Sequence, residues 1–128
     1  MSFPPVTSLL RHRPPALAVE RVEEHAEDRL VCSSVPARRW WWFELLDGAA
    51  QAAGLLLRGS TGRPLSAVVV AAYDELDLNV QSHEGPVRWE ARRKRRVGEM
   101  HQFEVSALAE DGHKLLSALV TLVPVAGG

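Results

Sequence analysis

The longest apolar segment of the chain runs from Trp40 to Leu57, with the sequence WWWFELLDGAAQAAGLLL. Its polar members are Glu44, Asp47 and Gln51. Their spacing places them on one side of a helix, where they form a polar stripe. A helix that is apolar on nearly every other side is buried, and a buried carboxylate is costly unless a partner satisfies it or a reaction uses it. We therefore expect this stripe to hold the functional residues.

Upstream of this helix, apolar and polar residues alternate roughly, as they do in strands. Strands at Leu17–Val22 and Arg29–Ser34 are predicted to form a hairpin, with its turn at His25–Asp28. The helix itself is expected to end near Arg58, because the loop GSTGRP that follows contains two glycines and a proline.

Downstream of that loop the pattern is that of strands. The β-branched run at Ser66–Ala72 suits a strand that is buried on both faces or lies against a helix. Gly98-Glu99 and Asp111-Gly112 are hairpin turn signals. The expected strands are Ser66–Ala72, Val87–Val97, Met100–Ala109 and Lys114–Val123, and Tyr73–Val80 carries apolar residues at period two. We therefore expect three or four antiparallel strands after the helix.

This order of elements indicates an α+β fold. Because the helix is apolar nearly all round, it needs a sheet that curls around it rather than a flat sheet on one side. We expect a curved antiparallel sheet of five to six strands wrapped around one long central helix, in a single domain spanning residues 1–128. A single layer seldom closes its own core, so we also expect two protomers to pair edge to edge.

Composition narrows the class of protein without naming an activity. Apolar residues make up 46% of the chain and charged residues 24%, as in soluble globular proteins. The net charge of −1 creates no field that would attract nucleic acid or a membrane. Cys32 is the single cysteine, which excludes an internal disulfide and fits a reducing compartment. We expect a cytoplasmic protein, without a cofactor or a metal site.

Three blocks of the chain carry a resemblance to a known family. Leu10–Val22, LRHRPPALAVERV, resembles a His-Arg-x-Pro segment followed by a strand that ends in an acid, Arg and Val. Asp47–Gly54, DGAAQAAG, resembles a helix segment in which an acid stands four residues before a Gln. Val87–Pro124 is similar in pattern to a set of closing hairpins. Together they resemble the hot-dog 3-hydroxyacyl-acyl-carrier-protein dehydratases of fatty acid synthesis and their relatives in aryl-polyene-type pathways, which implies a hot-dog fold.

The resemblance also implies a reaction. In that family a histidine from the partner protomer takes the proton next to the thioester, while a carboxylic acid on the central helix donates a proton to the leaving hydroxyl. Backbone N–H groups near the helix start hold the thioester oxygen. The match to Gln51 puts Asp47 at the position of the acid. The histidine position falls near Ser33, where this chain has no histidine, and the Gly-His-Phe-Pro-Gly type motif is absent.

The catalytic candidates are Asp47, Glu44 and His12. Asp47 lies in the middle of the stripe, and the alternative is a structural acid that is satisfied by an arginine or by backbone donors. Glu44 lies one turn earlier, and an alignment shifted by one turn would make it the catalytic acid. His12 is the histidine inside a family-like block, where a structural or substrate-entry role is the alternative.

Gly48, Gln51 and Trp42 are expected to contact substrate. Gly48 would let a substrate or the backbone approach the helix closely. Gln51 would line the same stripe, with packing and hydrogen bonding as the alternative. Trp42 would line an acyl or aryl tunnel, although the core is the alternative place for a tryptophan at the helix start.

Arg93 and Arg95 belong to the basic run RRKRR, and strand alternation is expected to turn both side chains inward. Together with Arg38 and Arg39 they would form a docking patch for an acidic carrier protein or for the phosphates of CoA. The alternative is a strand end that is exposed to solvent.

These expectations leave three functions open. The first is a dehydratase-like protein of fatty acid or polyketide-type biosynthesis, acting on 3-hydroxyacyl thioesters of acyl carrier protein or CoA. It would work as a homodimer or as a heterodimer with a His-bearing hot-dog subunit. The second is an acyl thioesterase of the same fold, in which one helix carboxylate activates or replaces water. The third is a non-catalytic subunit that binds acyl chains or completes a heterodimer.

Overall fold

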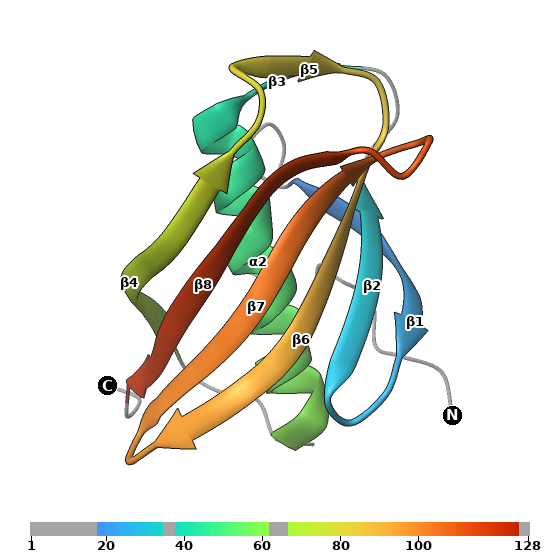
Figure 1. The fold of residues 1–128 in the computed structure, drawn as a ribbon. Coiled ribbons are helices and arrows are strands. Elements are labelled where there is room, and N and C mark those ends of the chain that lie inside the picture. The colour runs from blue at the N-terminus through green and yellow to red at the C-terminus, as the bar shows by residue number, and fades with distance from the viewer. Residues whose placement is uncertain (1–17, 35–37, 62–66, 126–128) are drawn as a thin grey trace.

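The computed structural model describes residues 18–34, 38–61 and 67–125 of the chain. Its main sheet is antiparallel, with six strands in the order β1-β2-β6-β7-β8-β4, and it curls around helix α2 (Figure 1). A second sheet of two strands lies beside the start of the helix. The elements are β1 (Val19–His25), β2 (Arg29–Ser34), β3 (Arg39–Trp41), α2 (Trp42–Thr61), β4 (Ala67–Leu78), β5 (Ser82–Glu84), β6 (Val87–Val97), β7 (Met100–Ala109) and β8 (Lys114–Val125).

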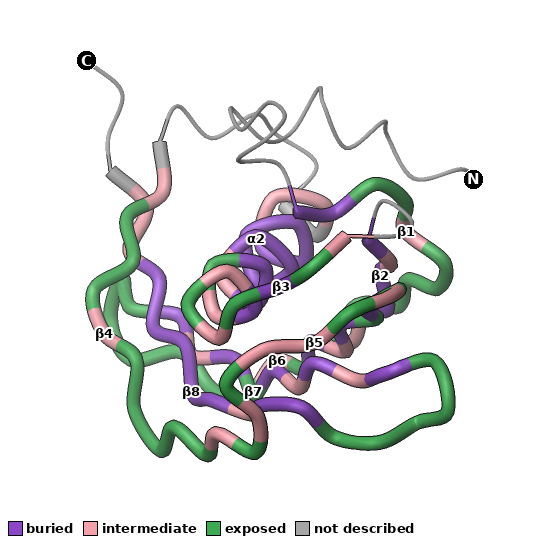
Figure 2. The backbone as a smooth tube through the Cα atoms, turned by 90° about the horizontal axis from the view of Figure 1, so that it is seen from above, coloured by how far each residue is buried: buried purple, intermediate pink, exposed green. Residues whose placement is uncertain are grey.

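The core lies between the concave face of the sheet and α2. Figure 2 shows buried backbone along the helix and at alternating positions of the neighbouring strands. This alternation follows from strand geometry, because every second side chain points to the same face. The largest apolar side chains of this core are Trp40, Trp89, Phe103, Leu30, Leu45, Leu55, Leu56, Leu57, Leu115, Leu116 and Leu122.

The predicted arrangement, a curved sheet of five to six strands around a central helix, is confirmed for the described part of the chain. The start of the helix differs from the prediction, because Trp40 lies in β3 and not in α2. Its side chain is buried, and its indole Nε1 donates a hydrogen bond to the carbonyl oxygen of Gly85 at 3.2 Å. Within residues 18–34, 38–61 and 67–125, no helix has the length and apolar character needed to cross a membrane.

Strand β4 continues from the β-branched run into the period-two segment that follows it. It lies at one edge of the six-stranded sheet, paired with β8. Of the two alternatives for its β-branched run, burial on both faces is wrong, since Val69 is 50% exposed and Val70 is 37% exposed. Val68 packs against the core, as in the alternative of a strand that lies against the helix. The strand carries two register shifts, and Glu75 in the second has a φ of 51°. Such bulges re-aim side chains at sheet edges.

Candidate active site

Glu44 holds the N-terminus of α2. Its Oε1 accepts a hydrogen bond from the backbone N–H of Trp41 at 2.9 Å, and its Oε2 pairs with the guanidinium of Arg38. Trp41 is the residue that precedes the helix, so this contact is the glutamate half of a capping box. The same Arg38 lies over the ring of Trp40, 4.0 Å from its centroid. Both carboxylate oxygens of Glu44 therefore have structural partners.

Asp47 is exposed, in contrast to the expected burial of the stripe. Its Oδ2 accepts a hydrogen bond from Gln51 Nε2 at 2.9 Å. Gln51 is 2% exposed, and its Oε1 accepts from the backbone N–H of Ala18 at 2.9 Å and of Val19 at 3.4 Å. Gln51 thus ties the helix to the start of β1 and orients the Asp47 carboxylate. The Asp47 carboxylate is thus at an exposed position, whereas Gln51 one turn later is buried.

Gly48, the next residue, faces the core of the protein. It is buried, and a Cβ at this position would overlap the indole ring of Trp89 on β6. Trp89 donates from its indole Nε1 to the carbonyl oxygen of Leu45 at 3.0 Å and packs edge-to-face against Trp40, with 5.5 Å between ring centroids. The close approach expected at Gly48 is therefore made by a core tryptophan of the same chain.

Exposed side chains with apolar surface lie one turn before Asp47 and on the helix side of the β4 edge. Phe43, one turn before Asp47, is 56% exposed. Val70 and Tyr73 of β4 pair with Leu122 and Val120, which are buried in the core, so all four lie on the helix-facing side of the sheet. We call Phe43, Asp47, Val70 and Tyr73 the Asp47 face. All four residues are exposed.

Tyr73 is not among the residues that the sequence pattern indicates as functional. Burial and the negative charge of Asp47 both raise the pKa of the Tyr73 phenol. The segment YDELDLNV contained the signal, because its apolar residues recur with period two and place Tyr73 on a strand. Its direction toward the helix could not be read, because it depends on the register shift before it.

Arg93 and Arg95 lie on opposite faces of the sheet. A register shift between them reverses the alternation, so Arg93 pairs with buried Phe103 while Arg95 pairs with Gln102. The Arg93 guanidinium lies 5.4 Å from the centroid of the Phe103 ring, and the Nε of Arg95 donates to the Gln102 side chain. The prediction that both turn inward is wrong for Arg95, because of this bulge.

Both arginines lie toward the β6–β7 hairpin, whereas the helix starts at the opposite end of the sheet (Figure 1). The structure therefore does not bring them together with Asp47. The arginines beside the helix start are Arg38 and Arg39, and Arg39 pairs with Glu84 at 2.9 Å.

The remaining candidates are Trp42, His12 and the cysteine. Trp42 is partly buried and stacks edge-to-face on Phe43, with 5.9 Å between centroids. His12 lies outside the described residues. Cys32 is fully buried beside Trp89 of the next strand, and burial raises the pKa of its thiol, so it stays protonated and unreactive. Among the described residues, no cluster of three or more His, Cys, Asp and Glu side chains is placed to hold a metal ion.

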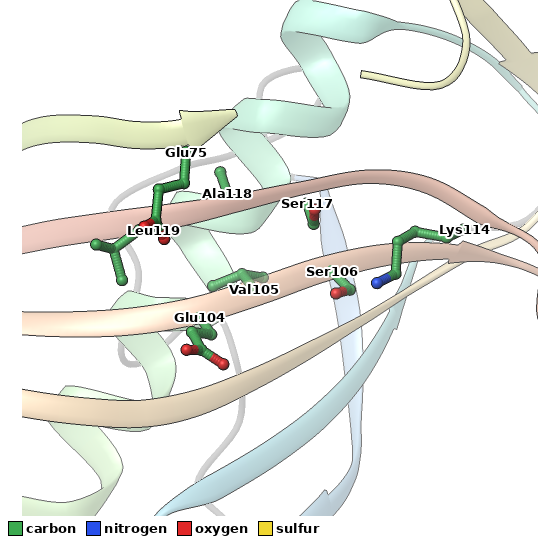
Figure 3. A pocket seen from close by; sticks show the side chains of 8 residues that line it. All are labelled: Glu75, Glu104, Val105, Ser106, Lys114, Ser117, Ala118 and Leu119. Atoms are coloured by element: carbon green, nitrogen blue, oxygen red, sulfur yellow. The ribbon is translucent and has the colours of Figure 1, made fainter. Parts of the chain in front are cut away.

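A pocket of about 200 Å³ lies away from Asp47, over strands β7 and β8 (Figure 3). Glu104, Ser106, Ser117 and Leu119 line it and pair with one another across these strands, on the face opposite the core. Glu104 is engaged by Lys94 at 3.4 Å. None of the candidate residues from the sequence lines this pocket.

The sequence matches no protein-family model and no curated protein sequence. Its structure is similar to the dehydratase heterocomplex ApeI:P from Xenorhabdus doucetiae, with a TM-score of 0.83 at 13% identity, covering 97% of this chain and 93% of that chain. It is also similar to the thioesterase HI1161 from Haemophilus influenzae, with a TM-score of 0.68 at 12% identity, covering 84% and 78%. The PaaI protein from the phenylacetic acid degradation operon of E. coli gives a TM-score of 0.67 at 12% identity, covering 84% and 80%.

At these identities, structural likeness establishes the fold and leaves the activity open. The curved antiparallel sheet, the central helix and these neighbours agree with one another. The chain therefore has the α+β hot-dog fold.

Proposed function

We propose that the protein is a dehydratase-like enzyme that acts on 3-hydroxyacyl thioesters at the Asp47 face. The observation that carries this proposal is the exposed carboxylate of Asp47 on the central helix. A hydrogen bond from Gln51 orients this carboxylate. Phe43 and Val70 supply apolar surface on which an acyl chain would lie. The similarity to a dehydratase heterocomplex supports this reaction class.

The reaction needs two groups that move protons. Elimination of water breaks a C–H bond beside the thioester and the C–O bond of the 3-hydroxyl, so one group takes a proton and another gives one. Asp47 is one of the two. No hydrogen bond or ion pair joins a histidine to Asp47 among the described residues. The second group therefore comes from a partner subunit or from another residue of this chain.

We further propose that the Asp47 face and the β4 edge pair with a second hot-dog subunit. Val69 is 50% exposed and Leu76 is 44% exposed on this strand, whose outer edge has no neighbour among the described strands. An exposed apolar edge strand is prone to pair with another chain. The partner is a second copy of this chain or a His-bearing hot-dog protein, and the heterocomplex among the structural neighbours supports the latter.

For the thioester carrier we propose acyl carrier protein or CoA. Arg38 and Arg39 lie beside the start of the helix, close to the Asp47 face, and would attract the phosphates or acidic side chains of the carrier. Both guanidinium groups already have carboxylate partners, so they would contribute mainly to the rate of encounter.

The test is to incubate the purified protein with 3-hydroxyacyl-CoA and with 3-hydroxyacyl carrier protein, and to measure the enoyl thioester by mass spectrometry. The protein is assayed alone and after co-expression with a His-bearing hot-dog subunit. We expect Asp47→Asn to lose about 100-fold or more of the activity. The matched control is Asp74→Asn, an exposed acid on the opposite face of β4. Absence of enoyl product under both conditions would refute the proposal.

A thioesterase is the second candidate, and the solved thioesterases among the structural neighbours favour it. Asp47 would then activate a water molecule for attack on the thioester carbonyl. The same incubations distinguish the two reactions, because hydrolysis releases a free thiol and dehydration does not. Thiol release that is lost in Asp47→Asn, without enoyl product, would replace the dehydratase by the thioesterase.

A further inference from the structure

Tyr73 is the single tyrosine of the chain. It lies in the middle of β4 and belongs to the Asp47 face. It pairs with Val120 of β8, whose side chain is fully buried in the core. Paired residues of antiparallel strands point to the same face, so the phenol points to the helix side of the sheet. The side chain is 37% exposed, so a molecule bound over the Asp47 face can reach it.

The position of Tyr73 on this face follows from the bulge before it. The register of β4 shifts between Val70 and Ala72, and after this shift Tyr73 takes the helix-facing place. The next residue, Asp74, pairs with Leu119 on the opposite face, where Leu119 also pairs with exposed Glu104. The bulge therefore delivers a hydroxyl, and not a carboxylate, to the side where Asp47 lies.

Asp47 and Tyr73 are both exposed, Asp47 on the helix and Tyr73 on the helix side of the β4 edge. Burial raises the pKa of the phenol, and the negative charge of Asp47 acts in the same direction. A phenol whose pKa is raised stays protonated at neutral pH, so it serves as a proton donor and not as a base.

We propose that Tyr73 is the second proton-transfer residue of the Asp47 site and donates a proton to the leaving hydroxyl group of the 3-hydroxyacyl thioester. This assignment rests on the proposed dehydratase function and deepens it. The Asp47 carboxylate then takes the proton from the carbon beside the thioester, so the roles differ from those that the family resemblance implies. The single chain thereby supplies both groups and needs no histidine.

The step balances. The C–H electron pair forms the C=C bond, the C–O bond breaks, and the hydroxyl leaves as water with the Tyr73 proton. Asp47 is then protonated and Tyr73 is a phenolate. Transfer of the proton from the carboxylic acid to the phenolate, directly or through one water molecule, restores both groups for the next turnover.

The first arm of the test measures the Asp47–Tyr73 interaction without any substrate. Ionisation of tyrosine is followed by ultraviolet absorption while pH is raised, and circular dichroism monitors that the protein stays folded. Because the chain has one tyrosine, the titration step belongs to Tyr73 and disappears in Tyr73→Phe. We expect Asp47→Asn to lower the pKa of Tyr73, since a nearby negative charge is removed. Asp74→Asn is the matched control, and an equal shift in both variants would overturn the pairing.

The second arm measures turnover of a 3-hydroxyacyl-CoA. We expect Tyr73→Phe to lower kcat by about 100-fold with little change in KM, and to remove the alkaline limb of the wild-type pH profile. A merely structural role would leave that limb in place. Full activity in Tyr73→Phe, with an active wild type, would refute the role of Tyr73 alone. A wild type that is active only with a His-bearing subunit would also refute the role of Tyr73, whereas inactivity both alone and with that subunit would refute the dehydratase function on which the role depends.

Discussion

Glu44 and Asp47 lie one turn apart on α2, yet the helix start around Glu44 and the open face around Asp47 differ in what they offer a carboxylate. Glu44 accepts from the Trp41 backbone and pairs with Arg38. Asp47 has a hydrogen bond to Gln51 and faces solvent beside exposed apolar side chains. The same polar stripe therefore contains an acid that stabilises the fold and an acid that is available for chemistry.

Gly48, on the buried side of the helix, tests the difference between buried and exposed positions of α2. Gly48→Ala would push a methyl group into the Trp89 ring, and such overpacking costs about 1–3 kcal/mol of unfolding free energy. Alanine has the higher helix propensity, so a merely local effect would stabilise the protein. Urea denaturation measures the change. Gly48→Ala should cost less unfolding free energy when Trp89→Leu is also present than when it is made alone. Equal costs in the two backgrounds would contradict the contact.

The link between the two sides is Gln51. Gln51→Leu keeps the approximate volume but leaves the backbone N–H groups of Ala18 and Val19 without their side-chain acceptor, at a cost of about 1–3 kcal/mol. It also removes the donor that orients Asp47, so turnover per folded molecule should fall as well. If denaturation shows the loss of stability while turnover stays at the wild-type value, Gln51 does not position Asp47.

At the helix start, Glu44→Ala should cost about 1 kcal/mol of stability, because the capping contact is lost. Glu44→Gln retains an oxygen acceptor for the Trp41 N–H and loses the ion pair with Arg38, so its cost should be smaller. Thermal denaturation orders the two variants. The reverse order would mean that the ion pair, and not the cap, is the stabilising contact.

The smallest expected effect concerns His101, which is buried on β7 beside Arg93. Burial, Arg96 and Arg93 lower its pKa below the ordinary 6.5. The unfolded chain therefore binds the proton first as pH falls through 6.5, and the folded protein loses stability from that pH downward. The difference in unfolding free energy between wild type and His101→Gln should decline from pH 7.5 to pH 5. A difference that is constant with pH would contradict this.

The sequence predicted those parts of the molecule that rest on periodicity. The apolar run of α2 and the alternating strands β6, β7 and β8 are long enough for their patterns to be read. The strands β3 and β5 have three residues each, which is too short for such a pattern. The sequence therefore predicts Trp40 as part of the apolar helix that follows it, although it lies in β3.

The site was less predictable, because it depends on which sides the sheet covers and on bulges. The polar stripe located Asp47, but its exposure follows from the position of the β4 edge, which no local pattern encodes. The register shifts in β4 and β6 move Tyr73 toward the helix and Arg95 away from it. A shift of one residue reverses the face of every side chain that follows, so sequence alternation alone misplaces such residues.

The most direct measurement of the difference between the two acids is the ratio of turnover per folded molecule in Asp47→Asn and Glu44→Gln, with one 3-hydroxyacyl thioester and with folded protein quantified for each variant. Both substitutions replace a carboxylate by an amide of similar size, one turn apart. We predict that Asp47→Asn is at least about 100-fold slower than Glu44→Gln, and that the latter retains near wild-type turnover. Loss of turnover in Glu44→Gln with activity retained in Asp47→Asn would contradict the assignment and move the reaction to the start of the helix.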